Sequence, residues 1–417
     1  MVTSNVETVN ITSVTANTVD LSGLDMTAAT DTLTLNLFTS ATTYAGITLS
    51  ATSAKTTTIN AAGAYGVTQT GRSATTAVDY TGSAGNDTFI MMTAGDKIAG
   101  GAGTGDTLDV NYAGVLGGIS VDLSATGEQI STLDGGAISG SITGFESVDL
   151  SGYTGFGASV TAIKTGSTIT GTGLTDRIAG GAGADTVRIV TTTSLNADTV
   201  NGGSGSNTLF IADDIADGAE TRNIINLSDF DNSKMANSDA FDNYSNFSNV
   251  DASANDTGSD DFTLVGTTGT NTLTGGAGED LITGAGGADT LDGGSGNDDF
   301  IYLLTADLFA SGTTVDTQIK GGGGTADEIV VGTSGTAFAI AATDVFDGVT
   351  TVESIRAVAN TVAVTIDLDV SAYAAGIRKV DISAADSGNN GSNVIDISEY
   401  VGTDATVLIG ADGTGTQ

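Results

Sequence analysis

The sequence contains no cysteine, histidine, proline or tryptophan among its 417 residues. Without cysteine there is no disulfide framework, and without cysteine or histidine there is no zinc site built on those residues. The absence of histidine also excludes a Ser-His-Asp triad and an imidazole general base. No apolar run is long enough to suggest a membrane span, and the N-terminus does not resemble a signal peptide. We therefore expect either another export route or a piece of a longer protein.

Basic residues are also scarce, with 12 Lys and Arg against 50 Asp and Glu and a formal net charge of -38. This balance argues against nucleic-acid binding, which needs basic side chains to displace phosphate counterions. It argues equally against a polybasic membrane-surface segment. The hydrophobic fraction of 39% exceeds what a solvating acidic tail would carry. The composition indicates an acidic fold whose charge is neutralised by metal ions.

What the sequence does contain is glycine, with 60 residues, and a nine-residue repeat. From Gly266 to Ile301 the units read GTTGTNTLT, GGAGEDLIT, GAGGADTLD and GGSGNDDFI without a gap. Their sixth positions are Asn271, Asp280, Asp289 and Asp298, and their eighth positions are Leu273, Ile282, Leu291 and Phe300. This is the G-G-x-G-x-D-x-U-x pattern of calcium-binding β-helix repeats.

Shorter blocks carry the same pattern elsewhere in the chain. In each, a polar sixth position recurs about every nine residues, although Asp106 and Asp327 each follow one inserted residue. Asp316 is one position out of register with Ile319, so it fits the repeat least well. The sixth positions of these blocks are Asp87, Asp96, Asp106, Asp176, Asp185, Asp198, Asn207 and Asp327.

Between the blocks a second motif recurs, in which an apolar residue and two polar ones precede a short alternating strand. Alternation with β-branched residues is typical of strands with one buried face. The copies are Val6–Thr12, Phe145–Ser151, Phe247–Ser253, Val352–Ala357 and Ile377–Ser383. The stretch from Asp213 to Asp261, rich in Asn, Asp and Ser, is interpreted as an insertion packed on the fold through Phe230, Phe241, Tyr244 and Phe247; a disordered loop is the alternative.

A nine-residue unit has enough residues for one three-residue strand and one turn. The apolar eighth position points inward, and the glycines of the turn allow positive φ and the convergence of carbonyl groups. Two units then form one flattened coil of 18 residues, and coils stack at the strand spacing of about 4.8 Å. We therefore expect Asp280 to lie over Asp298, and Asn271 over Asp289.

Carboxylates stacked so closely repel each other by several kcal/mol unless a cation lies between them. Oxygen ligands from aspartates and glycine-turn carbonyls suit calcium better than a transition metal. The core of one coil is thin, so metal binding should supply folding free energy directly. The sequence predicts several Ca²⁺ ions and a chain that is expanded without them.

The nonapeptides resemble the RTX family of secreted proteins of Gram-negative bacteria, tightly over Gly266–Ile301 and more loosely over the shorter blocks. The resemblance implies parallel β-rolls, calcium bound between turns and type I secretion. It implies that the sixth-position acids are calcium ligands, whereas Asn207 and Asn271 should give weaker or carbonyl-dominated sites. The turn glycines predicted to contribute to the sites are Gly180, Gly181, Gly183, Gly275, Gly276, Gly278, Gly284, Gly286, Gly293, Gly294 and Gly296.

The predicted fold is all-β, a right-handed parallel β-helix or β-roll solenoid in which calcium-binding RTX turns are interspersed with plain β-coils. We divide it into residues 1–80, strand-rich; 81–165, first RTX block with β-coils; 166–262, second RTX block with the insertion; 263–360, main β-roll; and 361–417, C-terminal β-coils.

Beyond the repeats, the acidic composition and the GFESVDLS-type strands are most similar to bacterial surface-layer proteins. We expect a structural rather than catalytic protein, secreted to the cell surface, whose copies assemble into a lattice in the presence of calcium. We expect no nucleic-acid partner, and any cell-surface polysaccharide would be held by a part not present here. The alternatives are a calcium-dependent RTX adhesin, or the non-catalytic β-roll part of a secreted hydrolase or toxin. A β-helix lyase using Lys, Arg or Tyr is the remaining catalytic reading, although Arg356, Arg378 and Lys379 fit surface charges better.

Overall fold

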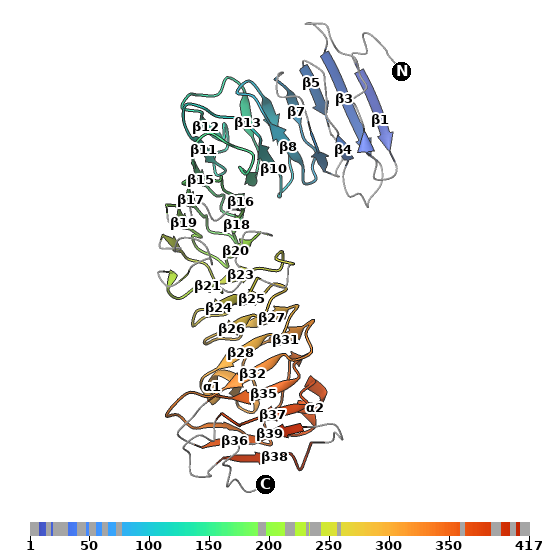
Figure 1. Cartoon of the computed structure of the whole chain (residues 1–417). Coiled ribbons are helices and arrows are strands. Elements are labelled where there is room, and N and C mark those ends of the chain that lie inside the picture. The colour runs from blue at the N-terminus through green and yellow to red at the C-terminus, as the bar shows by residue number, and fades with distance from the viewer. Residues whose placement is uncertain are drawn as a thin grey trace. The chain divides into compact units, whose positions relative to one another are not determined.

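The computed structural model describes residues 8–13, 18–19, 32–39, 47–49, 56–60, 66–71, 77–190, 197–212, 222–230, 233, 243–256, 260–358, 363–384, 393–400 and 406–408. The chain divides into two compact units (Figure 1). Unit 1 comprises Met1–Asn207 with Asn243–Asn246, and unit 2 comprises Thr208–Asp242 with Phe247–Gln417. The five segments predicted from the sequence are a different partition, and they stay a prediction.

In unit 1 successive strands alternate between sheets built almost wholly from parallel pairs. One sheet orders β2 (Thr18–Val19), β4 (Ile47–Leu49), β6 (Val67–Gln69), β8 (Thr88–Met91), β10 (Thr107–Val110), β14 (Ser147–Asp149), β16 (Thr168–Thr170) and β18 (Thr186–Ile189). A second orders β1 (Thr8–Ser13), β3 (Thr32–Thr39), β5 (Thr56–Asn60), β7 (Asp79–Thr81), β9 (Lys97–Ala99) and β13 (Ser141–Thr143). A third orders β12 (Ile130–Leu133), β11 (Ile119–Asp122), β15 (Ala158–Thr161), β17 (Arg177–Ala179), β19 (Thr199–Asn201) and β22 (Tyr244–Ser245), with β11 and β12 antiparallel.

Unit 2 repeats the same alternation. One row of strands is β20 (Thr208–Ile211), β23 (Asn249–Asp251), β25 (Thr272–Thr274), β27 (Thr290–Gly294), β31 (Gln318–Gly322) and β34 (Val349–Thr350). The other is β21 (Asn223–Asn226), β24 (Phe262–Val265), β26 (Leu281–Thr283), β28 (Asp299–Tyr302), β32 (Glu328–Val331), β35 (Ser354–Ala357), β37 (Lys379–Asp381) and β39 (Thr406–Leu408). Smaller sheets are β33 (Phe338–Ile340), β36 (Val364–Asp367) and β38 (Val394–Asp396), and the hairpin β29 (Phe309–Ala310) with β30 (Thr313–Thr314).

The register of the main block confirms the parallel solenoid with an 18-residue coil. Thr272 pairs with Thr290 across β25 and β27, and Leu281 pairs with Asp299 across β26 and β28. The eighth-position side chains fill the interior because each strand turns one residue inward. All are fully buried: Leu273, Ile282, Leu291 and Phe300.

The stretch from Asp213 to Asp261 is more regular than an insertion on the fold. Its described parts supply β21, β22 and β23, which pair in parallel with strands of their own units. Phe230 and Phe247 are buried in edge-to-face contact, with ring centroids 6.1 Å apart. Phe241 lies outside the described residues, as do most of residues 1–65 and 401–417.

Two short helices, which the sequence patterns did not predict, lie in unit 2. They are α1 (Thr305–Leu308) and α2 (Val370–Ala375). The side chain of Asp369 caps α2 by accepting the Ser371 N–H, and Gly376 ends it in the left-handed region. Helices this short span fewer than two turns, so a 3.6-residue periodicity cannot become visible in the sequence.

Candidate metal sites

The sixth-position aspartates of the main block form a continuous column of carboxylates. The N–H of Asp280 donates to Asp298 Oδ1 at 2.8 Å, and the N–H of Asp298 donates to Asp327 Oδ1 at 2.8 Å. On the opposite turns, the N–H of Asn271 donates to Asp289 Oδ1 at 2.7 Å. Each sixth-position carboxylate thus reaches back to the coil before it. We call such a column an aspartate ladder.

Unit 1 contains the same ladders. Oδ1 of Asp106 accepts the Asp87 N–H at 2.7 Å, and Oδ1 of Asp198 accepts the Asp176 N–H at 2.8 Å. The Asp185 N–H likewise donates to Oδ1 of Asn207 at 2.9 Å. These partners are 19 or 22 residues apart rather than 18, so the ladder continues although the coils differ in length.

Three of these carboxylates have a second oxygen that is buried and has no hydrogen-bond partner among the described residues. They are the Oδ2 atoms of Asp106, Asp298 and Asp327, and all three side chains are fully buried. A buried polar atom without a partner costs about 1–3 kcal/mol, and more when it is charged. A bound cation would remove that cost by giving Oδ2 a positive partner.

In several repeats the first glycine lies close to the aspartate Oδ2 of the same repeat. A Cβ added at Gly293 would lie 2.5 Å from the carbonyl oxygen of Gly321 and still closer to Asp298 Oδ2. A Cβ at Gly82 would lie 2.5 Å from Asp87 Oδ2 and would overlap the Gly100 carbonyl oxygen. A carboxylate and the carbonyl of the next coil therefore converge where only glycine fits. Carboxylate and carbonyl oxygens are the ligands that calcium prefers, so the residues present fit this ion.

Most of the remaining turn glycines predicted from the sequence lie close to their own repeat's aspartate or to the backbone of an adjacent coil. An added Cβ would overlap the aspartate Oδ2 of its own repeat at Gly275 and Gly284, as it would at Gly293. It would meet the backbone of an adjacent coil at Gly180, Gly181, Gly183, Gly276, Gly278, Gly294 and Gly296. Gly286 is different, because the nearest atom to its added Cβ is the Thr268 Cα, at 4.0 Å.

Burial raises the pKa of the ladder carboxyls into the neutral range. The pKa of Asp298 rises to about 8, through desolvation first and then through the charges of Asp280 and Asp327. Desolvation also raises the pKa of Asp280 and Asp289 to about 7. The pKa of Asp106 is raised to about 7, and that of Asp327 to about 6. Without a cation Asp298 would be mostly protonated at pH 7 and the groups with a pKa of about 7 would be about half protonated, whereas a divalent ion would keep them ionised.

Other predicted ligands are satisfied by protein groups. Asp176 accepts the N–H groups of Ala158 and Thr172, each at 2.7 Å. Asp96 accepts N–H groups from Val78, Met92 and Thr93. Asp185 and Asp280 likewise accept an N–H from their own turn as well as one from the preceding coil.

A tyrosine hydroxyl completes two of the aspartate sites. The Tyr244 hydroxyl donates to Asp198 Oδ2 at 3.3 Å. The Tyr302 hydroxyl donates to Oδ2 of Asp316, whose Oδ1 accepts the Asp289 N–H at 3.0 Å. Asp316 therefore continues a ladder despite its irregular spacing. Its sequence position gave little indication of this, because the extra residue before β31 conceals the repeat.

At the two asparagine positions the side-chain amide replaces the carboxylate. The Asn207 amide donates to the Asn246 carbonyl oxygen at 2.9 Å, and the Asn271 amide donates to the Ser248 carbonyl oxygen at 2.6 Å. At these two positions the amide N–H satisfies the carbonyl oxygen, as a cation would at an aspartate position. The expectation of weaker sites at both positions stays a prediction.

No group of three or more acidic side chains within the described residues is arranged to hold a metal ion. Each site would therefore rely on one or two carboxylates and on backbone carbonyl oxygens. That donor set suits calcium, which accepts six to eight oxygens of mixed kind.

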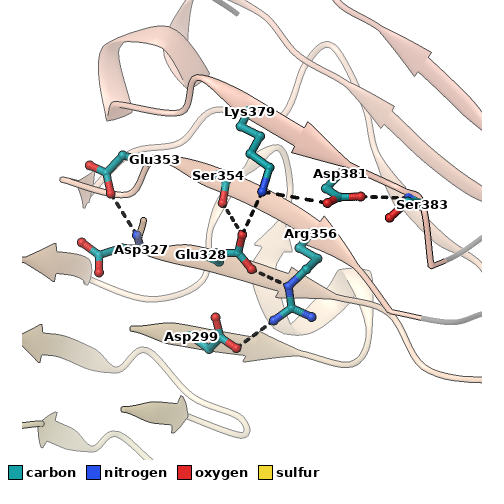
Figure 2. A network of polar contacts seen from close by, with 9 residues as sticks. All are labelled: Asp299, Asp327, Glu328, Glu353, Ser354, Arg356, Lys379, Asp381 and Ser383. Atoms are coloured by element: carbon teal, nitrogen blue, oxygen red, sulfur yellow. Dashed lines mark hydrogen bonds and ion pairs between the residues drawn. The ribbon is translucent and has the colours of Figure 1, made fainter. Parts of the chain in front are cut away.

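Arg356 and Lys379 lie in a network of ion pairs across β28, β32, β35 and β37 (Figure 2). The Arg356 guanidinium contacts Glu328 and lies 2.8 Å from Asp299 Oδ2. Lys379 Nζ lies 3.5 Å from Glu328 Oε1. The Arg378 guanidinium lies over the Tyr373 ring, 3.7 Å from its centroid. Arg356 and Lys379 thus make cross-strand contacts, and Arg378 contacts Tyr373 of α2.

Comparison with known families agrees with the ladders. The model of the RTX calcium-binding nonapeptide repeat (4 copies) matches residues 170–188, 193–210 and 265–300. No curated protein matches the chain. The chain thus carries calcium-binding repeats of RTX type, a repeat typical of secreted proteins. In the described parts of the chain, no helix is both long and apolar enough to cross a membrane.

Proposed function

We propose that this protein is a structural component of the bacterial cell surface whose copies assemble into a surface-layer lattice when calcium folds them. The RTX repeats supply the calcium-binding part of this function. The role we propose is structural rather than catalytic, because the ladder aspartates are engaged in hydrogen bonds or in the proposed calcium sites.

The observation that carries the assembly step is an apolar loop held rigidly in solvent. Val115 and Leu116 are 74% and 79% exposed. Oδ1 of Asp134 accepts the N–H groups of Val115, Leu116 and Gly117 at 2.7, 2.5 and 3.0 Å. Asp134 itself has a φ of +53°, which is unusual for a residue other than glycine. A loop fixed in this way presents its apolar side chains already ordered, which reduces the entropy cost of association.

The charge of the chain explains why calcium would control this association. With a formal net charge of -38, two copies repel each other at long range, and calcium bound in the ladders lowers that charge. The same ion would therefore both fold the chain and permit copies to approach. Anchoring to a cell-surface polysaccharide, through a part not present here, stays a prediction.

Electron microscopy of the purified chain with and without calcium tests the proposal. Two-dimensional sheets should appear only with calcium. The V115S/L116S variant should keep its calcium-dependent circular dichroism and lose the sheets, whereas V370S, which alters a 55% exposed valine, should assemble normally. Folded monomers of the wild type in calcium would contradict the lattice.

One observation favours a calcium-dependent adhesin as the second candidate. A shallow pocket of about 460 Å³ lies over β11, β15 and β17 and is lined by Phe156, Ser159 and Arg177 among others. An aromatic ring beside hydroxyl and guanidinium groups could hold a sugar. Glycan binding by calcium-loaded monomers that form no sheets would favour the adhesin over the lattice.

A further inference from the structure

Two RTX blocks end in the same arrangement of residues, 221 positions apart in the sequence. The first ends at Asp106, whose N–H donates to Glu146 Oε2 at 2.8 Å. The main block ends at Asp327, whose N–H donates to Glu353 Oε2 at 2.9 Å (Figure 2). In both, the glutamate belongs to the strand motif after the block and occupies the place of the next ladder aspartate. Neither glutamate is part of the nonapeptide pattern.

The backbone around these pairs is also the same. The carbonyl oxygen of the residue two positions before the glutamate points at the first glycine of the block's last repeat. A Cβ added at Gly100 would overlap the Gly144 carbonyl oxygen, and one added at Gly321 would overlap that of Thr351. Gly144 and Thr351 both have positive φ, at +73° and +53°. Positive φ is unusual for threonine, so the turn is held in this form by its surroundings.

Each arrangement encloses an oxygen that lacks a partner. Asp106 Oδ2 and Asp327 Oδ2 are buried and accept no hydrogen bond, although both side chains are fully buried. A Cβ at Gly321 would lie 2.5 Å from Asp327 Oδ2, which places this atom on the same side as the Thr351 carbonyl. At Asp327 a carboxylate oxygen and the Thr351 carbonyl oxygen thus converge, and Glu353, which accepts the Asp327 N–H, is their neighbour.

A third block ends in the same turn but with neutral residues. Asn207 takes the place of the aspartate, and its amide donates to the carbonyl oxygen of Asn246, which has a φ of +61°. The sequence position of the glutamate is occupied there by Ser248. Both acids are therefore absent together, and an amide N–H satisfies the carbonyl instead. This copy shows what the turn looks like when it needs no cation.

We propose that the two acidic block ends are calcium sites in which a glutamate outside the nonapeptide pattern is a ligand, formed by Asp106 with Glu146 and by Asp327 with Glu353. The Gly144 and Thr351 carbonyl oxygens complete the protein ligands. Calcium requires six to eight oxygens, so water would fill the remaining positions. Each ion would fasten the last RTX coil to the plain coil that follows it. The inference rests on the proposed calcium binding by the chain.

Counting bound calcium in folded protein tests the sites. Glu146→Gln and Glu353→Gln keep an oxygen that accepts the aspartate N–H but remove the charge. Each variant should lose one ion at saturation, or show a dissociation constant about tenfold higher for one ion. The double variant should lose two. The matched control is Glu399→Gln, which alters an exposed glutamate and should change nothing.

Circular dichroism in saturating calcium establishes that each variant is folded. If Glu353→Gln loses strand structure, D327N/E353S replaces it, because it reproduces the neutral pair of the third block and should fold with one ion fewer. Folded variants that bind the wild-type number of ions with unchanged affinity would overturn the proposal. A wild type that binds no calcium would instead contradict the calcium-binding premise itself.

Discussion

Replacing Asp298 by asparagine should change stability in opposite directions with and without calcium. Asp298 is fully buried, its Oδ2 has no partner, and its pKa is raised to about 8. In calcium-free protein at pH 7.5 the folded state must therefore protonate this carboxyl, which is ionised in the unfolded chain. Keeping this carboxyl buried with an oxygen that lacks a partner costs the folded state about 2 kcal/mol.

Asparagine removes this cost because its amide is neutral at every pH. It also supplies a donor close to the Gly321 carbonyl oxygen, as the Asn207 amide does toward the carbonyl oxygen of Asn246. Calcium-free D298N should therefore be about 2 kcal/mol more stable than the wild type. With calcium at about 1,000 times its dissociation constant, the wild type gains about 4.1 kcal/mol that the variant lacks, so D298N should then be less stable by about 2 kcal/mol.

Urea unfolding at pH 7.5, followed by far-ultraviolet circular dichroism in calcium and in chelator, measures both differences. Hydrogen exchange of β27, β28, β31 and β32 locates them. The control is Asp251→Asn, since Asp251 bonds only its own turn through the Ser253 N–H at 3.0 Å and lies outside the ladders. It should change stability by less than about 0.5 kcal/mol in both conditions. The same sign for D298N with and without calcium would refute the reasoning.

Three further results are expected. Calcium-free protein should lose stability as the pH rises from about 4 to 8, because the raised pKa values of the ladder carboxyls make the folded state bind more protons; thermal unfolding in chelator that is flat over this range would contradict it. Gly293→Ala should weaken calcium binding by at least about tenfold, since its Cβ would overlap Asp298 Oδ2, whereas Gly286→Ala, with open space around its Cβ, should not; equal calcium titrations would refute this. Arg356→Ala should lower the unfolding free energy by about 1 kcal/mol at low salt and by less at 1 M salt, because it leaves Glu328 with one cation fewer; a salt-independent loss would point to packing instead.

The periodic part of the fold could be predicted from the sequence because, in a parallel solenoid, the length of the repeat sets which residues pair between strands. A coil of 18 residues places each residue over the one 18 positions later, so Asp280 over Asp298 follows from counting. The inward eighth position follows from strand alternation, and it correctly predicted the buried column that includes Leu291. The resemblance of these same residues to RTX repeats further supported the prediction that they bind calcium.

Where coils differ in length, counting fails and strand pairing decides. Asp316 accepts from a residue 27 positions earlier, and Glu146 from one 40 positions earlier, separations that no repeat encodes. Glu146 and Glu353 both stand in the strand motif that recurs between the blocks, but that motif predicted only a strand. Their role as ladder ends depends on the register of the strands, in which Thr107 pairs with Ser147 and Glu328 with Ser354.

The sequence by itself therefore determined the coil, its core and most of the ladder carboxylates, because these repeat locally. Only the tertiary structure decided which carboxylate oxygens are left without a partner. Asp176 and Asp298 occupy the same repeat position, yet Asp176 accepts an N–H from its own turn and Asp298 Oδ2 accepts none. That difference depends on the turn and the coil stacked against each carboxylate, and so does the calcium site it implies.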